Sequence, residues 1–109
     1  MGSMIESAKH NRLIKAISER KLITFQYHGK SRLAEPHDYG ILRGARRLLS
    51  YQLGGESMTG GLPDWRLVEV GEIANLEITD RKFPGNRPAP SAQHYKWDLL
   101  FARVGENTT

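Results

Sequence analysis

The chain contains no cysteine, and this limits what it can fold into more than any other feature. Disulfides, thiolate metal sites and cysteine nucleophiles are excluded. The fold must therefore rest on a single hydrophobic core, for which 109 residues are enough. Hydrophobic residues form 39% of the chain, as is usual in a globular domain. A cysteine-free protein also fits the reducing cytoplasm, and we expect it there.

The sequence shows no signal for a membrane or for secretion. No stretch approaches the roughly 18 consecutive apolar residues of a membrane span, and no charged and then apolar leader opens the chain. Residues 1–3 precede a second methionine, Met4, and have the pattern of an expression scar. We expect one domain over residues 4–109 and no membrane partner.

Charge is distributed unevenly along the chain. Residues 1–50 hold ten Lys and Arg against four Asp and Glu, whereas residues 51–109 hold six against eight. Clustered cations raise the local potential and suit an anionic partner such as a nucleotide or a nucleic acid. A merely solvated basic surface explains the same distribution.

Hydrophobic periodicity predicts one helix followed by strands. Apolar residues recur every three or four positions from Ile5 to Ile17, which predicts an amphipathic helix that ends near Arg20. Residues 22–27 are rich in β-branched and aromatic types and predict a strand. Four further strands are expected at residues 31–35, 46–53, 65–70 and 73–78.

Several details of this strand pattern can be tested. Pro36 is expected to stop the second strand or to send it to a sheet edge, and a loop should follow over residues 37–40. In the third strand, Leu49, Tyr51 and Leu53 share the face expected to point into the core. A long glycine-rich loop is expected over residues 54–63.

The C-terminal quarter allows two interpretations. Prolines at positions 84, 88 and 90 predict an irregular strap over residues 80–90. Beyond it, a stripe at helical spacing predicts a second helix, formed by Trp97, Leu100, Phe101 and Val104. Alternation along the same segment also permits a strand. The fold class is thus α+β, with an N-terminal helix, five strands, a strap and a second helix.

Signals for catalysis and for metal binding are weak. Ser57, His37 and Asp64 supply the residue types of a catalytic triad, but no nucleophile-elbow pattern surrounds the serine. The four histidines lack the spacing of paired metal ligands on one element. Glu69 and Glu72 flank a predicted turn and should point into water. We therefore expect no enzyme, no metal and no cofactor.

Arginines supply the candidates for binding. Arg43, Arg46 and Arg47 could contact single-stranded nucleic acid, although strand geometry would send the last two to opposite faces. Arg66 lies on the same strand face as Val68 and Val70. If these valines point inward, its guanidinium stands at the mouth of the core, where an anion could meet it; if the other face points inward, Arg66 is solvated.

The order of these elements resembles the WYL family. The likeness covers Leu13 to Ile78 and rests on the helix, the strands that end at Tyr27 and Tyr51, and the strand, turn and strand from Arg66 to Ile73. The family's naming triplet falls on residues 46–48, where only the leucine is retained. Its arginine-rich signature falls on residues 66–73, where Glu69 and Glu72 replace two arginines.

The resemblance implies an Sm-like, SH3-type β-barrel over residues 22–78. The strap and second helix expected from the sequence pattern follow over residues 80–105. It also implies a bacterial module that senses a ligand or interacts with nucleic acid. We expect a non-enzymatic regulatory module for a small anionic or nucleotide-like ligand, with these candidate residues: Arg32, His37, Tyr39, Gln52, Ser57 and Arg66. This module would act through a partner chain or by dimerising, with Trp97, Phe101 and Val104 as the candidate contact. The alternatives are direct single-strand binding and a ligand-free assembly module.

Overall fold

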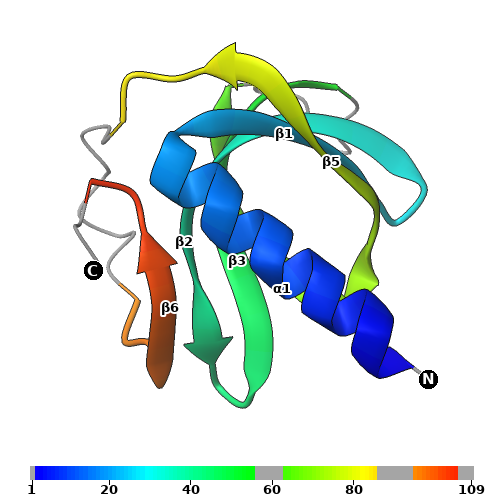
Figure 1. Cartoon of the computed structure of the whole chain (residues 1–109), viewed down its shortest axis with the longest axis vertical. Coiled ribbons are helices and arrows are strands. Elements are labelled where there is room, and N and C mark those ends of the chain that lie inside the picture. Colours follow the sequence, from blue (N-terminus) through cyan, green and yellow to red (C-terminus); the bar gives the residue numbers. More distant parts are fainter. Residues whose placement is uncertain (1, 56–62, 86–94, 106–109) are drawn as a thin grey trace.

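A single helix lies across the front of a strongly curved antiparallel sheet (Figure 1). The computed structural model describes residues 2–55, 63–85 and 95–105. Its elements are, in chain order, α1 (Gly2–Glu19), β1 (Lys21–Tyr27), β2 (Lys30–Leu42), β3 (Ala45–Gly55), β4 (Asp64–Glu69), the 3₁₀ turn η1 (Val70–Glu72), β5 (Ile73–Lys82) and β6 (Leu99–Arg103). The predicted α+β class and N-terminal helix are confirmed.

The core fills the space between α1 and the inner face of the sheet, by which we mean the face toward the helix. Leu13, Ala16 and Ile17 of α1 are fully buried there. They meet Ile23 and Phe25 of β1, which occupy alternate positions on one face as predicted. Burial of these apolar side chains is the main force that holds helix and sheet together.

The sheet does not close into a barrel. Its strands follow the order β4-β3-β2-β1-β5, and β6 also pairs with β2. In the described part of the chain β4 and β5 form no ladder with each other, although η1 joins them directly. At the seam between β1 and β4, the hydroxyl of Tyr27 accepts a hydrogen bond of 3.1 Å from the backbone N–H of Glu69.

The second strand is longer than the sequence indicated. We expected Pro36 to end it or to send it to an edge, with a loop to follow, but β2 continues to Leu42. Along one edge, β2 pairs with β1 up to Ala34 and with β6 from Asp38 onward. Pro36 lies between these two ladders, where its missing N–H interrupts neither of them. A register shift toward β3 next to His37 marks a bulge at the same point.

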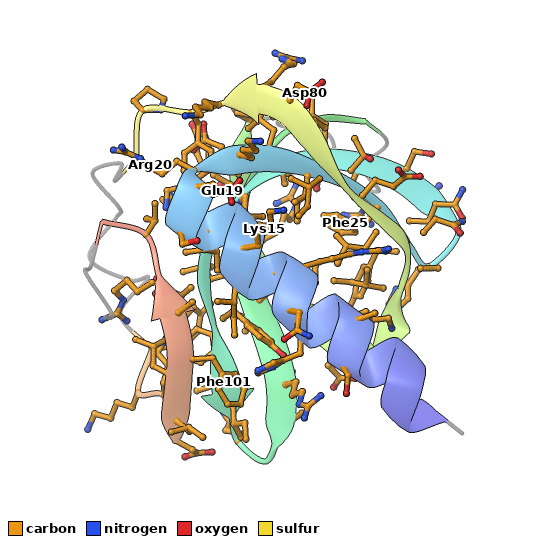
Figure 2. The ribbon with its side chains drawn as sticks, in the orientation of Figure 1. Lys15, Glu19, Arg20, Phe25, Asp80 and Phe101 are labelled. Carbon is orange, nitrogen blue, oxygen red and sulfur yellow. The ribbon has the colours of Figure 1, made fainter. Side chains whose placement is uncertain are left out.

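The predicted second helix is wrong. Residues 99–103 form β6, so the described chain has six strands rather than five, and the predicted strap starts later because β5 extends to Lys82. The second half of β2 would otherwise present an unpaired edge, and β6 satisfies its backbone groups. Phe101 lies beside β2, with its ring 5.0 Å from that of Tyr39 (Figure 2). The alternation of apolar residues in this segment, which permitted a strand, therefore predicted the structure better than the helical spacing did.

Candidate functional site

The inner face of β3 carries two polar residues, Ser50 and Gln52, beside the core residue Leu48. Ser50 and Gln52 are each 1% exposed, and register places them opposite Pro36 and Ala34 of β2. Tyr51 points to the outer face instead, where its ring stacks edge-on against Trp65 at 5.1 Å. The prediction that Tyr51 belongs to the core face was therefore wrong.

Arg32 and Gln52, two of the predicted ligand residues, meet on this inner face. Arg32 is paired with Phe25 of β1 and with Gly55 at the end of β3, so its side chain lies near the end of the sheet. Its Nη1 donates a hydrogen bond of 3.1 Å to Oε1 of Gln52. The amide of Gln52 then donates to the carbonyl of Gly54 at 3.0 Å. The glutamine therefore holds the guanidinium against the loop end of β3.

The guanidinium of Arg32 is enclosed by neutral groups. Arg32 is only 9% exposed, and its Cζ lies 5.5 Å from the ring centre of Tyr27. Its Nε is buried and has no hydrogen-bond partner. Among the described residues no carboxylate lies within ion-pair distance of it. A charge buried in this way is unusual, because desolvation normally demands an ionic partner.

Arg66 lies on the inner face of β4, which is one of the two orientations that the sequence allowed. Val68 and Val70 are 3% and 1% exposed and belong to the core, so Arg66 shares the inner face with them. It lies opposite Ser50 and hence one diagonal step from Gln52. Its Nη1 contacts Oδ2 of Asp64 at 2.9 Å, and the aspartate side chain is 55% exposed. The arginine thus stands at the mouth of the core, beside a solvated carboxylate.

His37 lies away from this group. It occupies the bulge of β2, and its Nε2 lies 3.0 Å from Oε1 of Glu35 on the outer face, with both side chains buried. Its ring also contacts Trp65 and Phe83 at centroid distances of 4.8 and 5.4 Å. The structure therefore does not bring His37 into contact with Arg32 or Arg66, as the predicted site requires.

The remaining candidates of the predicted ligand site fall elsewhere. Tyr39 is fully buried in the core, and its hydroxyl lies 2.8 Å from Nδ1 of His10. Ser57 lies outside the described residues. Of the six predicted residues, the structure groups Arg32, Gln52 and Arg66 at one end of the inner face.

The three arginines of the alternative nucleic-acid site differ in exposure and in their contacts. Arg43 and Arg46 are exposed on and beside the turn between β2 and β3. Arg47 is partly buried, donates from Nε to the carbonyl of Leu42 at 3.0 Å, and lies 3.5 Å from Glu69. The predicted separation of Arg46 from Arg47 on this strand agrees with these positions. Arg43 and Arg46 thus form a smaller cationic surface than the sequence suggested.

The pKa of Glu72 is shifted by its neighbours. Its pKa lies below the ordinary 4.5, chiefly because His28 hydrogen-bonds to the carboxylate and secondarily because Glu69 does so. Both carboxylates thus have local partners. The described residues contain no group of three or more His, Asp or Glu side chains placed to bind a metal ion.

The apolar stripe proposed for dimerisation is used within the fold. Val104 is 2% exposed and belongs to the core. Phe101 packs edge-on against His10 of α1 at 4.8 Å, and Trp97 stacks with Tyr95 at 6.5 Å. Because residues 99–103 form a strand and not a helix, Trp97, Phe101 and Val104 do not form a single helical face.

Sequence analysis missed one cationic group. Lys9 and Arg12, one turn apart on α1, reach across to the backbone of η1 and β5. Their three-residue spacing was visible, but it was interpreted only as the polar side of the helix. The contact of Arg12 with β5 depends on the direction in which α1 crosses the sheet, and the sequence does not specify this direction.

Comparison with known proteins adds no assignment. Neither protein-family models, nor curated proteins, nor solved structures give a match to the chain. Among the residues that the structure describes, there is no helix with the length and hydrophobicity needed to cross a bilayer.

Proposed function

We propose that the protein is a non-enzymatic binding module for a small anionic, nucleotide-like ligand. The site is the end of the inner face, where Arg32, Gln52 and Arg66 gather. Its most informative feature is the guanidinium of Arg32, which is 9% exposed and has a neutral amide as its hydrogen-bond acceptor. A bound phosphate or carboxylate would supply the missing counter-charge and an acceptor for Nε.

Arg66 would supply the accessible half of this site. Its ion pair with Asp64 is at the surface, since 55% of the aspartate side chain is exposed. Exposed pairs of this kind contribute only about 0–1 kcal/mol, so we expect the aspartate itself to hold the guanidinium weakly. Gln52 links the two arginines, because it contacts Arg32 directly and lies diagonal to Arg66. The ligand would therefore enter at Arg66 and end at Arg32.

The resemblance to the WYL family is a second, separate support. A helix followed by strands in the order β4-β3-β2-β1-β5, with a 3₁₀ turn between β4 and β5, is compatible with an opened Sm-like barrel. In such a module, ligand binding would act through a partner chain. Glu69 and Glu72, which replace two arginines of the family signature, point to a ligand with fewer negative charges than a long polyanion.

Thermal unfolding in the presence of adenosine monophosphate, adenosine triphosphate or inorganic phosphate tests the proposal. A ligand at about 100 times its dissociation constant adds about 2.7 kcal/mol of stability, which is on the order of 10 °C for a domain of this size. Arg32→Met should abolish this shift while the unliganded melting point stays level or rises, because an apolar side chain needs no counter-charge.

Two controls make the outcome decisive. Arg43→Met removes an exposed arginine from another surface and should keep the ligand shift. If Arg32→Met does not fold, Arg66→Gln takes its place and should weaken the shift. The proposal is wrong if none of the three anions shifts the wild-type protein. In that case, concentration-dependent light scattering would favour an assembly module.

Single-strand nucleic-acid binding remains a second candidate, because Arg43 and Arg46 are exposed and have no carboxylate within ion-pair distance in the described part of the chain. Its affinity for a single-stranded oligonucleotide should fall with log salt by about 0.7 log units per neutralised phosphate. Arg43→Gln should reduce that slope. A flat dependence excludes this function.

A further inference from the structure

A second polar groove runs between α1 and the edge strand β5. Two of its residues, Asn75 and Glu77, also line a hollow beside Arg32. It has a volume of about 580 Å³, within the range of pockets that hold small molecules. Its lining consists of Ala8, Lys9 and Arg12 from α1 and of Asn75, Leu76, Glu77 and Ile78 from β5. The groove therefore has two cations along one wall and two hydrogen-bond acceptors along the other.

The two cations are held in place by the backbone. Nζ of Lys9 donates to the carbonyl of Val70 at 3.2 Å, and Nη1 of Arg12 donates to the carbonyl of Leu76 at 3.1 Å. Each contact uses one donor, although an ammonium has three and a guanidinium five. No carboxylate of the described residues lies within ion-pair distance of either cation. Two positive charges thus line the groove with fixed side chains and spare donors.

The opposite wall supplies acceptors. Asn75 is held at a left-handed φ of 53°, at an irregularity in the pairing of β1 with β5. Its Nδ2 donates to Oε1 of Gln26 at 2.9 Å, while its Oδ1 accepts no hydrogen bond from the described residues. Glu77 is exposed beside it. Amide and carboxylate oxygens accept hydrogen bonds from hydroxyl groups.

We propose that this groove binds the phosphate monoester of a small polyhydroxylated molecule. Lys9 and Arg12 would bind the phosphate, since a doubly charged anion matches two adjacent cations and the planar guanidinium can contact two of its oxygens. Asn75 and Glu77 would accept hydrogen bonds from the hydroxyl groups. Glu77 also disfavours a long polyanion, whose further phosphates would meet its carboxylate. Lys9 and Arg12, which would hold the phosphate, do not line the hollow at Arg32, so the two proposals can be tested separately.

A purely structural role for the two cations is the competing explanation. β5 is an edge strand, and positive side chains over exposed carbonyls protect such edges from pairing with other chains. That role uses the two hydrogen bonds already present and predicts no affinity for phosphate. The two explanations therefore differ in a measurable property.

A ¹⁵N NMR titration of the whole chain with glucose 6-phosphate tests the proposal. Amide shifts should concentrate at residues 8–12 and 75–78, and glucose alone should cause none. Inorganic phosphate should shift residues 8–12 more weakly. Lys9→Gln and Arg12→Gln should each raise the dissociation constant about tenfold, because each loses a charged hydrogen bond.

Lys15→Gln is the matched control, because it removes one exposed charge from the same helix outside the groove (Figure 2). Its dissociation constant should stay within about twofold of the wild type. Three results overturn the proposal: no shifts with glucose 6-phosphate, an equal loss in Lys15→Gln, or shifts only around Arg32, Gln52 and Arg66. The last result would support the proposed function and exclude this groove. If a groove variant does not fold, the location of the wild-type shifts decides.

Discussion

Nε2 of His37 lies 3.0 Å from Oε1 of Glu35, and both side chains are almost completely buried on the outer face of β2. This pair explains why the predicted site divides into two parts. The imidazole was expected to face an incoming anion, yet it is directed to a carboxylate of its own strand. Glu35 and His37 are two positions apart in β2, so the period of the strand places both side chains on the same face. The anion-binding role therefore stays with the arginines.

We expect His37→Ala to lower the free energy of unfolding by about 3 kcal/mol, because removal of one partner leaves the other buried with less compensation. Urea denaturation at neutral pH measures this. His28→Ala is the control, since it breaks a pair of the same chemistry, with Glu72, at the surface. Its denaturation midpoint should hardly change. Equal losses in both variants would show that burial does not decide the strength of the pair.

The hydrogen bond between Tyr27 and Glu69 is the next testable contact, because it spans the seam between β1 and β4. Tyr27→Phe should cost about 1 kcal/mol in unfolding free energy through loss of this bond. Tyr95→Phe removes a hydroxyl from a half-buried tyrosine outside the seam and should cost less. A Tyr27→Phe variant as stable as the wild type would mean that this hydrogen bond does not stabilise the contact between β1 and β4.

Gly40 of β2 tests how β6 docks. A β-carbon at this position would overlap the carbonyl oxygen of Leu99 and lie 2.9 Å from Cα of Leu100. Gly40→Ala should therefore destabilise the protein by on the order of 2 kcal/mol and speed amide exchange in β6. Gly71→Ala is the control, since its β-carbon would meet nothing within 4 Å. Unchanged exchange in β6 would contradict the close packing of the two strands.

Glu72 gives a prediction for pH. Its pKa is lowered mainly by the hydrogen bond with His28, so the folded state favours the ionised carboxylate. The resulting stabilisation is complete above the ordinary value of 4.5 and is lost as the pH falls through the lower pKa of the folded protein. Carbon-detected NMR of the Glu72 carboxyl should show titration below 4.5 in the wild type. His28→Ala should move it back toward that value; no movement would assign the shift to Glu69.

Part of the candidate site could be predicted from sequence. The sequence allowed Arg66 either to share the core-facing side of its strand with Val68 and Val70 or to point into solvent. The burial of the two valines shows that the first alternative holds. The contact of Arg32 with Gln52 was not visible, because it depends on a register shift between β2 and β3 after Leu33. The groove at Lys9 and Arg12 was missed, since its other wall lies more than 60 residues away along the chain.

The sequence by itself determined the local elements, because their periods depend only on near neighbours. The helix that buries Leu13 and Ile17 and the strand that buries Ile23 and Phe25 both follow from spacing. Tertiary structure alone decided which face of β3 points inward, how far β2 runs past Pro36, and that residues 99–103 pair as a strand. In each case the local sequence was compatible with two conformations. Hydrogen bonding of the backbone groups to a strand far away in the sequence selected one of them.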